Sequence, residues 1–385
     1  MRVLQIVNLG FGAGGAEKSV RLIAEGLGAR GHRVRVVATD LLADGREVFA
    51  DRLVPAIGGS AAARLRRKFW YRRAYRDLRA EIAEFPPDVV HLHTVGEFSP
   101  SVLDATRGLP RVLTVHGPED WTRDLLRWNL PSAAAGGRLS AADTARLLYL
   151  RLLQRPAYLP RLRRVDLLLA PSRYFAGAVR ADAGRVPVRV LPNGIPRLTA
   201  AAPPAPGREV LFVGRLERVK GVHVLLEAFD AVRRRFPDAR LTVVGDGAER
   251  AALERTAREL PCGGVEFTGW AEQRQVAERL RAAAVVVLPS LWPENFPTVA
   301  LEALQLGRPL VASRVGGLPE LVGEDNGVLV APGDPAALAA ALTGLLGDPE
   351  RLRRLGAASA ARADHYGVEE FLDALERHYG EVRTR

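Results

Sequence analysis

Short apolar runs alternate along the whole chain with segments of helical periodicity. A run such as Val285-Val286-Val287-Leu288 is apolar at every position, which is typical of a strand covered on both faces in a parallel sheet. The predicted strands are Arg2–Leu9, Arg33–Thr39, Asp88–His93, Arg111–His116, Val165–Pro171, Val188–Leu191, Glu209–Val213, Leu241–Val244, Val265–Thr268, Val285–Leu288 and Pro309–Ser313. Such regular alternation predicts an α/β fold with parallel sheets.

The segments between these strands place apolar residues every three or four positions, which predicts amphipathic helices. The predicted helices are Ala16–Arg30, Val222–Arg235, Ala248–Leu260, Glu272–Ala283, Thr298–Leu306, Pro335–Leu346, Pro349–Ala363 and Glu369–Tyr379. The alternation stops at residues 199–207, which read Thr-Ala-Ala-Ala-Pro-Pro-Ala-Pro-Gly and predict an interdomain linker. We therefore expect one α/β domain over residues 1–198 and another over 208–365, with the last helix, within 366–385, packing back on the first domain.

Composition narrows the class of protein. The chain has 385 residues, which fits two domains of about 150–200 residues, and 48% of them are hydrophobic. A single cysteine, Cys262, rules out an internal disulfide and favours a reducing compartment. No apolar run reaches the ~20 residues of a membrane span, and the first residues are typical of a strand rather than a signal peptide. These features predict a cytoplasmic protein.

The net charge of +11 belongs to the first half of the chain. Residues 1–200 carry +14 and residues 201–385 carry −3. Because 52 of the 55 basic residues are arginines, the high pI reflects residue usage, and we expect no nucleic-acid partner. Arg64–Arg79 holds eight basic residues and one acid among aromatic residues. If helical, this segment is either a basic amphipathic helix on an anionic membrane surface or a solvated helix of a soluble domain.

Two glutamates flank the start of a predicted helix in the second half. The stretch from Ser290 to Ala303 follows the strand Val285–Leu288 and places Glu294 in the loop and Glu302 one turn into the helix. The amides of Thr298 and Val299 at the helix start suit a phosphate. In open α/β sheets, ligands bind in the crevice at the carboxyl ends of the strands. A phosphate site between two carboxylates indicates a nucleotide-sugar, although acids near a helix start are also common because they favour the first turn.

Other strand-end loops of the second half carry compatible chemistry. Arg215 and Lys220 follow the strand Glu209–Val213 and could clamp a diphosphate, although two exposed charges are the simpler interpretation. Lys220 is one of only three lysines in the chain, which indicates that a compact ammonium group is needed there. Gly269 and Trp270 could border a flat base, or Trp270 could be plain packing.

The first half offers a glycine-rich loop and three candidate histidines among its four. Gly10, Gly12 and Gly15 formally fit the dinucleotide-binding pattern, which keeps an NAD-dependent oxidoreductase as an alternative. His91 and His93 share one face of a strand and could form a metal pair, but no suitable third ligand accompanies them. No Asp-x-Asp occurs. His116, directly after the strand Arg111–Val115, is either functional or structural.

Together these residues resemble glycosyltransferase family 4, whose retaining enzymes use nucleotide-sugars. The most specific match is Glu294 and Glu302 with seven residues between them. The remaining matches are Gly14-Gly15-Ala16-Glu17, Pro192-Asn193-Gly194-Ile195, Val213-Gly214-Arg215-Leu216 with Lys220-Gly221, and Val315-Gly316-Gly317-Leu318-Pro319-Glu320. The resemblance implies the GT-B fold, an α/β arrangement of two Rossmann-like domains that face each other across a cleft.

The resemblance also implies roles for individual residues. Arg215 and Lys220 would hold the donor diphosphate, Glu302 the ribose, and Glu294 the hydroxyls of the transferred sugar. Gly15 would close over the diphosphate, and His116 would lie beside the sugar. The implied catalytic residues are Glu294, His116, Arg215 and Lys220. The implied donor-binding residues are Gly14, Gly15, Asn193, Gly194, Arg215, Lys220, Gly269, Trp270, Glu294, Phe296, Pro297, Thr298, Val299 and Glu302. Pro297 replaces the family's usual glycine and lacks an amide donor, so the contact to the sugar differs there.

The implied reaction is metal-independent, retaining transfer of a hexose-type sugar to a hydroxyl, without a cofactor. The acceptor would bind the basic first domain and would be a lipid-linked or cell-envelope glycan precursor at the inner face of the membrane. A sugar-nucleotide epimerase or another GT-B enzyme, such as a phosphorylase, is the main alternative. An NAD-dependent oxidoreductase and a non-catalytic nucleotide-sugar-binding protein are the remaining alternatives.

Overall fold

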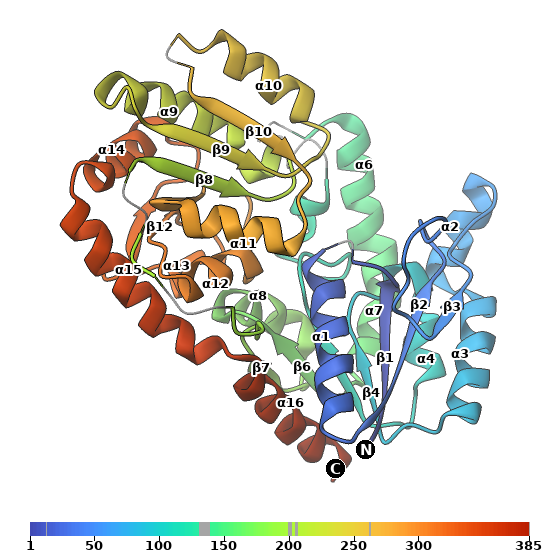
Figure 1. Cartoon of the computed structure of the whole chain (residues 1–385). Coiled ribbons are helices and arrows are strands. Elements are labelled where there is room, and N and C mark those ends of the chain that lie inside the picture. Colours follow the sequence, from blue (N-terminus) through green and yellow to red (C-terminus); the bar gives the residue numbers. More distant parts are fainter. Residues whose placement is uncertain (13, 131–138, 199–201, 205–206, 262, 385) are drawn as a thin grey trace. The chain divides into compact units, whose positions relative to one another are not determined.

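The computed structural model describes residues 1–385 apart from 13, 131–138, 199–201, 205–206, 262 and 385. The chain forms two compact α/β units (Figure 1). The first contains the described residues up to Gly194 together with those from Val368 onward, and the second runs from Ile195 to Gly367. Much of the predicted linker and the cysteine at position 262 lie outside the described residues.

The first unit is built on a parallel sheet of seven strands in the order β3-β2-β1-β4-β5-β6-β7. The strands are β1 (Arg2–Leu9), β2 (Arg33–Thr39), β3 (Arg52–Val54), β4 (Val89–Leu92), β5 (Arg111–Thr114), β6 (Leu167–Ala170) and β7 (Val188–Val190). Every residue of β4, β5 and β6 is buried, because helices cover both faces of the sheet. The continuous apolar runs therefore predicted the central strands correctly.

Helices and short helical turns connect these strands. They are α1 (Gly15–Ala29), α2 (Ala61–Phe69), α3 (Arg72–Glu84), η1 (Gly96–Phe98), α4 (Ser101–Ala105), η2 (Leu126–Asn129), α6 (Ala141–Tyr149), the π-helical turn η3 (Leu150–Gln154), α7 (Arg155–Leu162), α8 (Arg173–Ala183) and α16 (Val368–Arg383). Ser60, Ser140 and Ser172 cap α2, α6 and α8, and each hydroxyl accepts a hydrogen bond from the amide three residues later. These caps fix where the three helices begin.

The basic segment Arg64–Arg79 is not one helix. Trp70 and Tyr71 adopt extended backbone conformations and separate α2 from α3. Tyr71 is 6% exposed in the core, and its amide donates to the Ser99 hydroxyl at 3.0 Å. Burial of this tyrosine outweighs helix propensity, which explains the break that periodicity alone did not predict. No residue of α2 is buried.

The C-terminal helix α16 belongs to the first unit. Leu375 and Tyr379 are fully buried in a cluster with Ile23 and Leu27 of α1. At the end of α1, Arg30 forms ion pairs with acids of α16, including Asp373 at 2.7 Å. Apolar burial provides most of the stabilisation and the ion pairs fix the register, because exposed pairs contribute little.

The second unit contains a parallel sheet of six strands in the order β10-β9-β8-β11-β12-β13. The strands are β8 (Glu209–Val213), β9 (Arg240–Val244), β10 (Val265–Gly269), β11 (Val285–Leu288), β12 (Leu310–Ser313) and β13 (Gly327–Val330). The helical elements are η4 (Arg218–Lys220), α9 (Val222–Arg235), α10 (Arg250–Glu259), α11 (Gln273–Ala282), α12 (Thr298–Gln305), α13 (Leu318–Leu321), α14 (Pro335–Leu346), α15 (Pro349–Ala363) and η5 (Asp364–Tyr366).

Both sheets reverse their winding direction at one point, which is where ligands bind in open α/β folds. The reversal lies between β1 and β4 in the first sheet and between β8 and β11 in the second. A ligand-binding site is therefore expected in the loops after these four strands. None of the helices in the described part of the chain is long and apolar enough to cross a membrane.

Candidate active site

The loops after β8 and β11 lie in direct contact at the reversal point of the second sheet. The amide of Leu291 donates to the carbonyl of Val219 at 2.7 Å. Gly221 has φ +71°, and a Cβ atom there would lie 1.9 Å from the carbonyl oxygen of Pro289. Only glycine combines this backbone conformation with so close an approach. The sequence thus brings the end of η4 against the β11 loop.

Lys220 and Glu294 meet at this contact. The Lys220 Nζ atom donates to Glu294 Oε1 at 2.7 Å, and the Ser290 hydroxyl donates to the same oxygen at 2.6 Å. The side chains of Lys220 and Glu294 are 17% and 9% exposed. The ammonium group also lies 5.0 Å from the centre of the Trp292 ring, which gives a cation–π contact. These contacts hold a cation and a carboxylate in fixed positions beyond the carboxyl ends of β8 and β11.

The Glu294 carboxyl group is ionised in this setting. Burial would raise its pKa, but the charge and hydrogen bond of Lys220, together with Ser290, outweigh burial and hold the pKa below its usual value. The β12 loop fixes the backbone of the same residue. Gly317 N–H donates to the Glu294 carbonyl at 2.7 Å, and Gly316 has φ +56° where a Cβ atom would lie 2.1 Å from that carbonyl oxygen.

Glu302 lies in α12 and is also buried. Its Oε1 atom accepts a hydrogen bond from Gln273 Nε2 of α11 at 2.9 Å. Pro297 precedes α12, and the first amide to bond within the helix is that of Ala300, which donates to the Pro297 carbonyl at 3.1 Å. The half-buried Thr298 and Val299 come before it, as predicted from the helix start.

The remaining predicted donor residues of the second unit lie in less constrained positions. Arg215 is exposed and forms an ion pair with Glu217 at 2.8 Å, so it is not joined to the Lys220–Glu294 pair. Gly269 ends β10 at the edge of the sheet, and Trp270 is 74% exposed. Phe296 is buried, with its ring 5.4 Å from that of Tyr366. The roles predicted for these residues stay predictions.

The first unit places its glycine loop after β1, at the reversal point of its own sheet. Gly14 precedes α1 in an extended conformation, and Gly15 is the first residue of the helix. A Cβ atom at Gly15 would meet nothing within 4 Å, so the backbone there is open to a ligand. Asn193 and Gly194 follow the edge strand β7. The donor-binding roles of these residues also remain predictions.

His91 in β4, His93 directly after it and the half-buried His116 after β5 form one polar cluster. His93 Nδ1 lies 2.9 Å from His116 Nε2, and His93 Nε2 lies 3.0 Å from Gln5 Oε1. His91 instead bonds Tyr379 and Thr114, each at 2.7 Å. Hydrogen bonds to protein groups thus occupy the ring nitrogens of the proposed metal pair. The described residues contain no group of three or more His, Cys, Asp or Glu side chains that could hold a metal.

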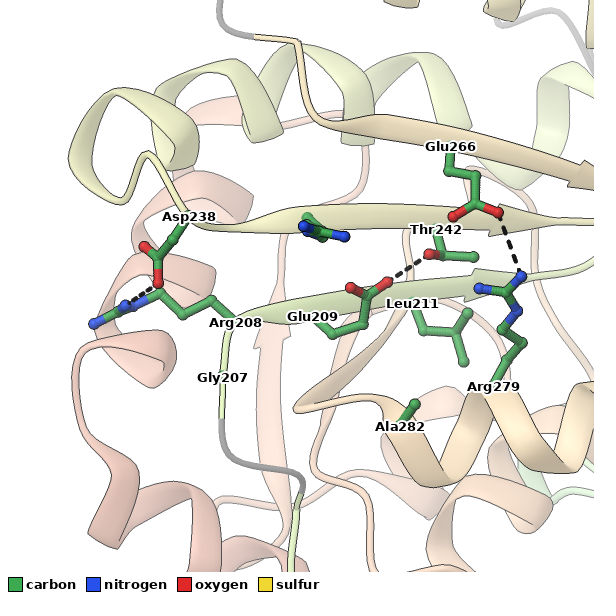
Figure 2. Close-up of a pocket in the computed structure, with 10 residues that line it drawn as sticks. Gly207, Arg208, Glu209, Leu211, Asp238, Thr242, Glu266, Arg279 and Ala282 are labelled. Carbon is green, nitrogen blue, oxygen red and sulfur yellow. Dashed lines mark hydrogen bonds and ion pairs between the residues drawn. The ribbon is translucent and has the colours of Figure 1, made fainter.

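A cavity of about 390 Å³ lies away from this site (Figure 2). Its lining includes Glu209 and Arg240, the first residues of β8 and β9, so it opens at the amino ends of the strands. Several of its charged groups already have partners, such as Arg279 with Glu266 at 3.3 Å and Glu209 with Thr242 at 2.5 Å. Ligands of open α/β sheets bind at the opposite, carboxyl ends. We therefore take the Lys220–Glu294 pair as the candidate active site.

Sequence reasoning missed Ser290 and Gln273, which hold the two glutamates of the second unit, and the contacts of His93 with Gln5 and His116 in the first unit. Ser290 was within the stretch that the sequence singled out, but a serine after a strand carries no distinctive signal. The hydrogen bonds of Gln273 and Gln5 join residues 29 and 88 positions apart. No local pattern predicts such contacts.

Two family models and several known proteins match the sequence of this chain. Residues 13–197 match the model described as Glycosyltransferase Family 4, and residues 207–348 match Glycosyl transferases group 1. A phosphatidyl-myo-inositol mannosyltransferase of Mycolicibacterium smegmatis is 30% identical over 369 residues, covering 92% of this chain and 86% of the relative. A glycogen synthase of Mycobacterium tuberculosis is 38% identical over 185 residues, and the chain covers only 44% of that protein's length.

Solved structures confirm the fold class. HepE of Anabaena in complex with UDP-glucose matches with a TM-score of 0.74 at 20% identity, and the match covers 99% of this chain and 100% of the other. The two parallel-sheet α/β units are thus those of the predicted GT-B class. Because both units match glycosyltransferase models, the glycine loop does not identify an oxidoreductase. The chain belongs to glycosyltransferase family 4.

Proposed function

We propose that this chain transfers a hexose-type sugar from a nucleoside-diphosphate sugar to a hydroxyl of an acceptor, with retention of anomeric configuration. One observation carries the proposal most directly: the ion pair of the half-buried Lys220 with the buried Glu294, at the reversal point of the second sheet. A cation there suits a diphosphate, and a carboxylate there suits sugar hydroxyls. HepE, which shares the fold, was solved with UDP-glucose, and this supports a nucleotide-sugar donor.

The residues would divide the work of one substitution at the anomeric carbon. Lys220, Arg215 and the amides at the start of α12 would stabilise the nucleoside diphosphate as its bond to the sugar breaks. Glu302 would bind the ribose and Glu294 the sugar hydroxyls. The acceptor oxygen would bond to the anomeric carbon from the face that the diphosphate leaves, and its proton would pass to a phosphate oxygen. This step requires no protein nucleophile, and NMR of the fresh product would show its anomeric configuration.

We further propose that transfer is independent of metal and of any bound cofactor. The fixed positive charge of Lys220 and the α12 amides can neutralise a leaving diphosphate, which is the task of a divalent ion in other transferases. In the described ranges of the chain no cluster of three carboxylate, histidine or cysteine ligands accompanies the site. Transfer in the presence of excess chelator supports this proposal, and restoration by added Mg²⁺ would contradict it.

The acceptor is proposed to be lipid-linked, at the inner face of the membrane. The relative of M. smegmatis is named for a phosphatidyl-inositol acceptor, and the first half of this chain carries the positive charge. Helix α2 has no buried residue, and it ends beside Trp70, which is 40% exposed, while Leu65 is 51% exposed. Exposed apolar side chains among arginines favour an anionic lipid surface.

Charge reversal on α2 tests membrane binding. We expect the wild type to float with vesicles that contain anionic lipid at about 0.15 M salt, because each basic residue near the surface contributes about 1 kcal/mol. The double variant Arg64→Glu/Arg66→Glu should lose flotation. Arg353→Glu/Arg354→Glu, the same charge change at exposed positions of α15, should retain it. Equal flotation of the two variants, or none for the wild type, would rule out this surface.

The two glutamates should differ in what they recognise. Glu294→Gln should reduce discrimination among sugars on one nucleotide while changing affinity for the free nucleoside diphosphate less than about threefold, because that carboxylate contacts the sugar. Glu302→Gln should weaken binding of the free nucleoside diphosphate about tenfold, which is the effect of losing one charged hydrogen bond. Isothermal titration with the diphosphate and two of its sugars measures both effects. If Glu294→Gln loses equal affinity for the free diphosphate and for its sugars, Glu294 does not contact the sugar.

A further inference from the structure

A chain of hydrogen bonds links three neighbouring strands of the first sheet and ends at His116. Gln5 lies in β1, His93 directly follows β4, and His116 follows β5 after one residue. The contacts run from Gln5 Oε1 to His93 Nε2 at 3.0 Å, and from His93 Nδ1 to His116 Nε2 at 2.9 Å. Gln5 and His93 are almost fully buried, whereas His116 is half-buried. The series of hydrogen bonds therefore leads from the core to the half-buried ring of His116.

The donor and acceptor of each hydrogen bond in this series follow from the orientation of the Gln5 amide. Gln5 Nε2 donates to the carbonyl of Val20 at 3.3 Å, so the amide oxygen, not its nitrogen, faces His93. His93 Nε2 must then carry the proton, and a neutral His93 accepts at Nδ1. The atom that faces this lone pair is His116 Nε2, which must therefore be the protonated nitrogen. His116 is left with a lone pair on Nδ1, for which the described residues provide no hydrogen-bond partner.

This arrangement of donors and acceptors requires that His93 and His116 are both neutral. Burial, followed by the nearby His91 and His116, lowers the pKa of His93 well below its ordinary value. Burial lowers the pKa of His116 to about 4. Both rings are therefore neutral at physiological pH, and no second proton reverses the hydrogen bonds.

We infer that Gln5 and His93 are positioning residues that hold His116 in the Nε2–H tautomer, so that its Nδ1 atom accepts a hydrogen bond from a substrate hydroxyl. This inference rests on the proposed sugar transfer. An atom that only accepts cannot bind a phosphate oxygen, but it suits the O–H of a sugar. The hydroxyl could belong to the transferred sugar or to the acceptor, which share this chemistry.

The tautomer of the wild type can be measured without any substrate. In protein labelled with ¹⁵N-histidine, long-range ¹H–¹⁵N spectra distinguish a protonated ring nitrogen from one with a lone pair. We expect His116 to show Nε2–H and a bare Nδ1 at neutral pH. A proton on Nδ1, or rapid exchange between tautomers, would overturn the inference. This result does not depend on whether the protein transfers sugar, so it separates the inference from the proposed function.

His93→Phe breaks the chain at similar volume, and His91→Phe is its matched control. Both histidines are about 1% exposed on the same segment, but His91 bonds Thr114 and Tyr379 and takes no part in the chain. We expect His93→Phe to release the His116 tautomer and to lower kcat/KM about tenfold, the loss of one oriented hydrogen bond. His91→Phe should leave the tautomer unchanged. The same tautomer signal in both variants would contradict a positioning role.

A second variant covers the case in which His93→Phe does not fold. Gln5→Met removes the acceptor for His93 Nε2–H and keeps both rings, so we expect mixed tautomers of His116. An unchanged Nε2–H signal in Gln5→Met would also overturn the inference. Deoxy analogues identify the hydroxyl: if it is on the transferred sugar, a deoxy donor loses activity in the wild type but not in His93→Phe. If a deoxy acceptor shows this pattern instead, the hydroxyl belongs to the acceptor.

Discussion

Lys220→Met is expected to abolish most transfer and to destabilise the second unit. Activity should fall about 10²–10³-fold, because a fixed cation that stabilises the leaving diphosphate is lost. The free energy of unfolding should fall by about 3 kcal/mol, because Glu294 keeps a buried charge without its ammonium partner at 2.7 Å. Initial rates of nucleoside diphosphate release and urea denaturation measure the two effects.

A second substitution separates these two effects. Lys220→Met/Glu294→Gln removes the uncompensated charge, so most of the lost stability should return while activity stays low. Arg218→Met is the control, since it removes an exposed cation from the same short helix and should change stability by less than about 0.5 kcal/mol. Recovery of activity together with stability in the double variant would show that Lys220 only balances the charge of Glu294.

Gly221→Ala should disrupt the contact that creates the site. The added Cβ atom would lie 1.9 Å from the Pro289 carbonyl oxygen and 2.9 Å from its carbonyl carbon. Both of these are backbone atoms, so no side chain can move aside. The β8 and β11 loops must then separate, which moves Lys220 away from Glu294. We expect the variant to lose about 1–3 kcal/mol of unfolding free energy beyond the cost of the left-handed conformation itself, and transfer should fall with it.

Gly31→Ala measures the cost of that conformation by itself. Gly31 has φ +82°, close to the +71° of Gly221, but a Cβ atom there would meet nothing within 4 Å. A loss of about 1–2 kcal/mol is expected for Gly31→Ala, with activity intact. If the two alanine variants are equally stable, the close approach of the loops is not a constraint.

The sequence predicted those elements whose pattern is complete within a few residues. The strands Glu209–Val213 and Val285–Leu288 and the helix Val222–Arg235 have the predicted bounds, because their apolar runs and periodicity are uninterrupted. The short β3 and β13 were not predicted. The sequence did not predict that burial of Tyr71 divides Arg64–Arg79 between two helices.

The candidate site was predicted as residues rather than as contacts. The sequence placed Lys220 and Glu294 at carboxyl ends of strands in one crevice, and the sheet order confirms that β8 and β11 are neighbours. It did not predict that the two form an ion pair, since they are 74 residues apart. The bonds of His93 to Gln5 and His116 likewise depend on strand pairing, which no local pattern encodes.

Binding of nucleotide-sugars to the wild type and to Lys220→Met tests the central claim most directly. In a thermal-shift screen of UDP-, GDP- and ADP-sugars, at least one should raise the Tm of the wild type by about 2–5 °C at ~100 Kd. The same ligand should give little or no shift with Lys220→Met. No shift with any nucleotide-sugar, or an equal shift in the two proteins, would contradict a donor site at the Lys220–Glu294 pair.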